Sequence, residues 1–106
     1  MKKGLPVQNA GENLVSLFIE PYGEDFWLQP GEVFTVTPTV AGVDVQFSMA
    51  VAADHITVWL YEDADPYKVI LDFEVLDEGG AALECGHQRP TASREERQVR
   101  ALPSTE

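Results

Sequence analysis

The chain has 106 residues and a mass of 11.7 kDa, the size of one domain. A folded chain of this length buries roughly two-thirds of its unfolded surface. Apolar residues make up 44% of the sequence, which is typical of a globular protein and excludes a disordered chain. The 18 acidic side chains outnumber the 7 basic ones and give a formal net charge of -11, which argues against nucleic acid and anionic membrane surfaces as partners.

The sequence gives no sign of export or membrane insertion. Cys85 is the single cysteine, so no disulfide within the chain is expected and a cytoplasmic location is predicted. Lys2 and Lys3 are followed by polar residues such as Asn9 and Glu12, where a secretory signal needs an apolar run. No apolar run approaches the ~18 residues of a membrane span.

Short runs rich in Val, Ile, Phe, Thr, Trp and Tyr alternate with clusters of Pro, Gly, Asp and Glu over residues 13–76. This pattern is typical of an antiparallel meander or Greek key. The predicted fold class is therefore all-β, a small antiparallel β-barrel or β-sandwich of six to seven strands. The strands expected in chain order are Leu14–Glu20, Phe26–Gln29, Glu32–Val40, Val43–Val51, His55–Glu62 and Tyr67–Leu76.

Several local signals refine this prediction. Pro30 and Gly31 fit the central positions of a type II turn. Pro38 predicts an edge strand, a bulge or a break, because proline has no N–H for a ladder. Apolar residues alternate strictly with polar or small ones over Val43–Val51, which indicates a β-strand. His55–Glu62 carries bulky residues on both faces, so we expect a central strand or one that faces a partner.

The charge distribution predicts a single β domain at residues 1–86 and a C-terminal tail at residues 87–106. Residues 1–86 carry 15 acidic and 3 basic side chains, whereas residues 87–106 carry 3 and 4. Ser93 and Glu96 match a capping box, so this segment is expected to be either a frayed tail or a short helix around residues 94–102 that Pro103 ends.

The candidate metal ligands are Cys85, His87 and His55. They are fewer than the four ligands of a structural zinc site, and no methionine follows Cys85 as a blue-copper site requires. The acidic residues near Asp63 do not form an EF-hand. We therefore predict no metal and no cofactor. No Gly-x-Ser-x-Gly motif is present and no residue set fills the catalytic roles, so we predict no catalytic residues.

Aromatic residues form the main candidate binding surface. Trp59 and Tyr61 share a strand face with His55, and Trp27 must point to the opposite face from its neighbour Phe26. Aromatic residues with polar groups are enriched at interfaces. The candidate binding residues are therefore Trp27, His55, Trp59 and Tyr61. The alternative is that both strand faces are buried inside a sandwich or a closed barrel.

The stretch from Ile19 to Glu32 contains a Glu-Pro-Tyr-Gly turn and a Pro-Gly-Glu turn, and Ile56-Thr57-Val58-Trp59 follows further along. In these motifs the chain resembles short uncharacterised bacterial all-β proteins that carry the same two turns. The resemblance covers about half of the chain. The resemblance implies a small barrel or sandwich without an assigned function. Pro-Gly-Glu turns also occur in cupins and cupredoxins, but this chain has no His-x-His pair and lacks the cupredoxin order of Cys and Met.

Together these features predict a non-catalytic acidic β domain that acts as a protein-interaction or self-association module. It would engage a protein partner, or form a homodimer, through an aromatic strand face or an open sheet edge. The alternative is a small-molecule or metal-binding cupin-like barrel with His55, Trp59 and Tyr61 at its mouth.

Overall fold

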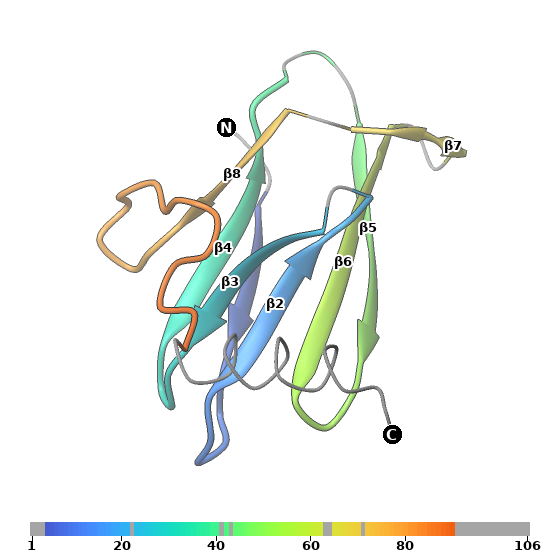
Figure 1. Ribbon diagram of the computed structural model, residues 1–106. Coiled ribbons are helices and arrows are strands. Elements are labelled where there is room, and N and C mark those ends of the chain that lie inside the picture. The colour runs from blue at the N-terminus through green and yellow to red at the C-terminus, as the bar shows by residue number, and fades with distance from the viewer. Residues whose placement is uncertain are drawn as a thin grey trace, which may run out of the picture.

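The computed structural model describes residues 4–21, 23–40, 42, 44–62, 65–70 and 72–90. This part of the chain is all-β, with eight strands in two sheets and no helix (Figure 1). The all-β prediction is therefore confirmed, but the two sheets remain open and do not close into a barrel. The strands are β1 (Leu5–Gln8), β2 (Val15–Ile19), β3 (Glu24–Leu28), β4 (Val33–Pro38), β5 (Val45–Val51), β6 (His55–Glu62), β7 (Asp65–Val69) and β8 (Phe73–Leu76).

One sheet has three strands in the order β1-β4-β8, and the other has five. The five-stranded sheet runs β3-β2-β6-β5, and β7 also pairs with β6. All pairs are antiparallel except β2 with β6, which run parallel from Ser16 opposite His55 to Ile19 opposite Val58. The two strands can be parallel because the chain crosses to the three-stranded sheet and back between them.

The structure has more strands than predicted, for two reasons. β1 was not expected, because it has only four residues and one of them is Pro6. The predicted strand Tyr67–Leu76 is divided between β7 and β8, which belong to different sheets. Ile70 lies between these two strands and is buried. The unbroken apolar alternation across residues 67–76 hides this change of sheet.

Other local predictions are confirmed. Gly31 has φ +87°, and the Glu32 N–H donates to the Gln29 carbonyl at 3.0 Å, as a type II turn at Pro30-Gly31 requires. β6 has the predicted bounds and is a central strand between β2 and β5. Pro38 is the last residue of β4, so the break is correct, but the edge position is wrong because β4 is central in its sheet.

One apolar core takes residues from both sheets. The largest fully buried side chains are Phe26 of the five-stranded sheet and Phe34 of the three-stranded sheet. The buried apolar residues occupy every second position of their strands, as Leu17 and Ile19 do in β2 and Phe34 and Val36 in β4. The remaining members are Val7, Leu17, Ile19, Leu28, Val36, Val45, Val58, Leu60, Ile70 and Val75.

The alternation predicted for Val43–Val51 is present in β5, but the core covers only its beginning. Val45 is buried, whereas Met49 is 49% exposed and Val51 is 74% exposed. Val43 lies outside the described residues.

Within the described ranges, no helix has the length and apolar character needed to span a membrane. Residues 87–90 run beside β3 and bond to it. The predicted tail helix around residues 94–102 lies outside the described residues.

Candidate functional site

The four predicted binding residues lie on one face of the five-stranded sheet, the face opposite the core. His55, Trp59 and Tyr61 share this face of β6 because side chains alternate along a strand. Trp27 of β3 is opposite Ser16, which in turn is opposite His55. All four predicted residues are half-buried. The structure thus brings them to a common face, and their binding role remains a prediction.

Two of these residues use their polar groups within the protein. His55 Nδ1 lies 2.9 Å from Asp54 Oδ1, and this hydrogen bond lowers the pKa of the Asp54 carboxyl. The His55 ring also meets the Phe18 ring edge to face, with centroids 5.9 Å apart. Trp27 Nε1 donates to Asp25 Oδ2 at 2.7 Å. These groups already have partners on their own chain.

Asp25 is the centre of a polar cluster that the sequence did not indicate. It lies on β3 and is 6% exposed. Arg89 holds its carboxylate with two hydrogen bonds, from Nε to Oδ2 at 2.7 Å and from a terminal nitrogen to Oδ1. The Trp27 indole N–H donates a second hydrogen bond to Asp25 Oδ2, and Cys85 Sγ lies 3.6 Å from Asp25 Oδ1.

This cluster is suited to holding structure rather than to catalysis. The Arg89 hydrogen bonds lower the pKa of Asp25 from 3.8 to about 2, against the opposing effect of burial. A carboxyl with this pKa stays ionised near neutral pH, so it has no proton to donate as a general acid and is only a weak general base there. Its charge is already balanced by the guanidinium, in the two-point geometry that favours Arg over Lys.

Arg89 belongs to the edge segment, residues 84–89, which covers the free edge of β3. The Gly86 N–H donates to the Asp25 carbonyl at 2.6 Å, and the Trp27 N–H donates to the His87 carbonyl at 2.9 Å. The Gln88 side chain donates to the Trp27 carbonyl at 2.7 Å. The outward carbonyl of Asp25 and both outward backbone groups of Trp27 are thus bonded, and the pair of Asp25 and Arg89 holds the segment in place.

A glycine allows the edge segment to bend under Arg89. Gly86 has φ +87°, a conformation that side-chain-bearing residues rarely adopt. A Cβ at this position would lie 3.1 Å from the guanidinium of Arg89. The conformation and the available space therefore both favour glycine here.

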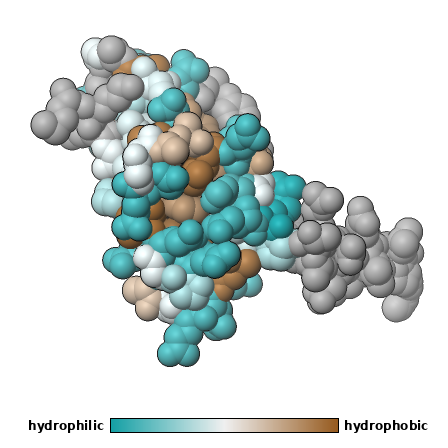
Figure 2. Space-filling model, turned by 90° about the vertical axis from the view of Figure 1, so that its left-hand side faces the viewer, coloured by the Kyte–Doolittle hydropathy of each residue, from teal (hydrophilic) through white to brown (hydrophobic). Residues whose placement is uncertain are grey.

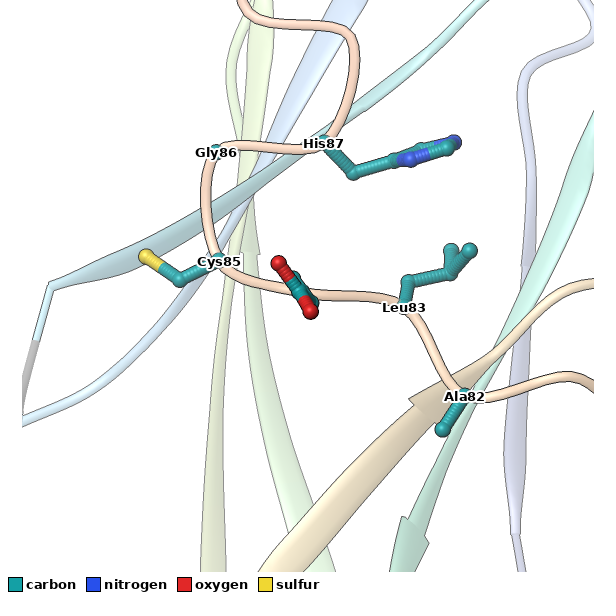
Figure 3. Close-up of a pocket in the computed structure, with 6 residues that line it drawn as sticks. Ala82, Leu83, Cys85, Gly86 and His87 are labelled. Carbon is teal, nitrogen blue, oxygen red and sulfur yellow. The ribbon is translucent and has the colours of Figure 1, made fainter.

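The three candidate metal ligands do not converge. Cys85 and His87 line one open hollow of about 360 Å³, but their side chains leave the edge segment in opposite directions (Figure 3). The His87 ring packs edge to face on Phe34 with centroids 5.5 Å apart. Across the described ranges, no group of three or more His, Cys, Asp or Glu side chains could hold a metal ion.

Figure 2 views the molecule from the side on which residues 77–90 lie in Figure 1. Hydrophilic residues surround a smaller apolar area there. The large apolar residues that are most exposed belong to other strands, Met49 and Val51 to β5 and Tyr67 to β7. β5 forms the edge of the five-stranded sheet opposite to β3.

The outer edge of β5 presents backbone groups that no strand among the described residues pairs with. The Ala52 N–H donates to the His55 carbonyl at 2.9 Å, which fixes the phase of the antiparallel ladder with β6. Alternate residues of β5, from Gln46 to Ala50, therefore direct their N–H and C=O toward β6. The backbone N–H and C=O groups of the other residues point outward, namely those of Val45, Phe47, Met49 and Val51. No strand in the described part of the chain pairs with these outward groups.

The same residues carry the incompletely covered apolar side chains. Exposure increases along the strand, from buried Val45 through half-buried Phe47 to Met49 and Val51. β5 contains no charged residue, proline or glycine. β1, at an edge of the other sheet, contains Pro6. Within the described part of the chain, the β5 edge therefore combines unpaired backbone with exposed apolar surface.

Sequence reasoning missed both features. Asp25 and Arg89 are 64 positions apart in the chain, and nothing local distinguishes Asp25 among 18 acidic residues. The β5 edge had one usable signal, seven consecutive strand residues without a charge. Comparisons with protein-family models, with curated proteins and with solved structures find no match.

Proposed function

We propose that this protein is a non-catalytic interaction module that binds an extended segment of a partner protein along the β5 edge. The observation that carries the proposal is the outward backbone of Val45, Phe47, Met49 and Val51, next to the exposed side chains of the last two. A partner strand would continue the five-stranded sheet through main-chain hydrogen bonds. Its apolar side chains would cover Met49 and Val51.

The composition of β5 supports this choice. Proteins usually protect an open edge against pairing with lysine, proline, bulges or covering loops. The β3 edge is covered by the edge segment, whereas β5 has none of these protections among the described residues. An edge without protection is suited to receiving another strand.

We further infer that the two sheets pack as an open β-sandwich, since they contribute to one core. The module would act in the cytoplasm, consistent with a single exposed thiol at Cys85. Neither nucleic acid nor a membrane surface is proposed as a partner, because of the net charge of -11. The aromatic face with Trp59 and Tyr61 remains the alternative contact surface, and the small-molecule or metal site remains a prediction without further support.

Amide hydrogen exchange measured by NMR tests the proposal. In the free protein we expect the outward amides of Phe47, Met49 and Val51 to exchange at least about tenfold faster than those of Ser48 and Ala50, which bond to β6. An uncharged heptapeptide, acetyl-Ser-Val-Thr-Val-Thr-Val-Ser-amide, serves as the probe strand. Its addition should slow exchange at the outward amides.

Two variants at one position separate backbone from side chain. Met49→Pro removes an N–H that points outward and leaves the β6 ladder intact, so we expect peptide affinity to fall about fivefold or more relative to Met49→Ala. Equal affinity of these variants, or no slowing at millimolar peptide, would overturn the proposal. Slowing that grows with protein concentration alone would assign the edge to a second copy instead of a partner.

A further inference from the structure

We propose that the segment received by β5 is basic, with an uncharged alternating centre and Lys or Arg at its ends. This inference rests on the proposed function and adds the chemistry of the partner. It starts from the distribution of positive charge. The sequence contains no Lys or Arg between Gly4 and Tyr67, while 10 of the 18 acidic residues fall in this range.

The cations of the described residues are themselves paired. Arg89 binds Asp25, and Lys68 Nζ lies 4.0 Å from Glu62 Oε1. These two are the only Lys or Arg side chains in the ranges that the structure describes. As far as the described residues go, the surface around β5 therefore offers a partner carboxylates and little positive charge.

Carboxylates lie near both ends of β5. Beyond Val51, the Asp54 side chain is 85% exposed. At the other end, Val45 is opposite Glu62, which is opposite Asp65 on β7, with Lys68 as the neighbouring cation. The strand between these ends is uncharged. A complementary partner has positive charges near its ends and none between them.

A second copy is a poorer occupant for the same reason. It would bring its own net charge of -11 and place its acidic residues near those of the first copy. Charges within the Debye length of about 8 Å at physiological salt still repel. A basic segment turns this repulsion into attraction while using the same backbone bonds.

The alternation of side chains along a strand determines which residue types suit the centre of the partner segment. Side chains on the core-facing side would meet Met49 and Val51 and should be apolar. Side chains on the other side would lie next to Ser48 and Ala50 and should be small or polar. Val and Thr in alternation satisfy both requirements with high strand propensity.

Three peptides that differ only at their ends test the inference by NMR titration. They share the centre Val-Thr-Val-Thr-Val and carry Lys, Ser or Glu at both ends. We expect the Lys peptide to bind about tenfold tighter than the Glu peptide at low salt, with the Ser peptide between them. This difference should shrink by at least about half at 0.5 M NaCl, where screening is strong.

Asp54→Asn locates the charge effect, because it keeps a hydrogen-bond acceptor for His55. It should reduce the advantage of the Lys peptide by about twofold. Glu84→Gln is the matched control, because Glu84 is an exposed acidic residue at the opposite, β3 edge of the sheet. This variant should leave the affinity advantage of the Lys peptide unchanged.

The outcomes distinguish the two proposals. If none of the peptides slows exchange at Met49, the interaction module itself is wrong. If all three bind β5 equally, or the Glu peptide binds best, the module stands and the basic partner is wrong. If a second copy occupies the edge in the absence of peptide, the basic partner is likewise overturned.

Discussion

The five-stranded sheet has two edges that differ in how their backbone groups are covered. At β3, the edge segment bonds to the Asp25 carbonyl and to both outward backbone groups of Trp27, and Arg89 holds it with a partly buried ion pair. At β5, no strand pairs with the outward backbone in the part of the chain that the structure describes, and Met49 and Val51 are exposed. In Figure 1, the edge segment lies beside β3 and β5 borders the sheet on the other side.

The contrast shows that this fold can cover an edge with a short loop when one polar anchor is available. A loop of six residues suffices at β3 because the Arg89–Asp25 pair supplies charge-assisted hydrogen bonds on top of the backbone bonds. β5 has no charged residue that could anchor a similar loop. The difference between the edges is therefore a difference in anchoring groups.

The largest expected effect comes from removing the anchor of the covered edge. Arg89→Met leaves the Asp25 charge buried without its partner, and we expect the free energy of unfolding to fall by about 2 kcal/mol. Urea denaturation followed by tryptophan fluorescence measures this, with Trp27 in the cluster as a local probe. Lys68→Met removes an exposed pair and should cost under about 0.5 kcal/mol. Equal losses in the two variants would show that the anchor does not stabilise the fold.

Acid should weaken the same anchor. The pKa of Asp25 is lowered in the folded protein to about 2 from an ordinary value of 3.8. Its contribution to stability is therefore complete above about pH 4 and is lost as the pH falls toward 2, by about 2 kcal/mol in total.

Denaturation curves between pH 5 and pH 2 test this prediction. Other carboxylates titrate in the same range, so the quantity of interest is the difference between the wild type and Arg89→Met. This difference should decrease with falling pH. A constant difference would contradict the assigned role of Asp25.

A smaller effect is expected from the bend in the edge segment. Gly86 and Gly80 have nearly the same φ, +87° and +88°, but only a Cβ at Gly86 would meet another group, the Arg89 guanidinium. Both Gly→Ala changes should cost about 1 kcal/mol for the backbone conformation. Gly86→Ala should cost roughly 1 kcal/mol more for the contact. Thermal denaturation measures both, and the extra cost should disappear in the Arg89→Met background.

The sequence alone determined the features that depend on neighbouring residues. The type II turn at Pro30-Gly31 and the bounds of β6 follow from backbone preferences and from the period of two in the side chains. The all-β class follows from the repetition of such signals along the chain. Each is a property of a few consecutive residues.

Only the tertiary structure decided which segments meet. The parallel pairing of β2 with β6, the division of Tyr67–Leu76 between two sheets and the Asp25–Arg89 pair join residues without a local signal. The exposure of Val51 could not be predicted from the sequence either, because alternation shows which side chains share a strand face but not what covers that face. Coverage depends on the placement of the second sheet and of distant loops, and these decide which edge of the sheet is closed and which is open.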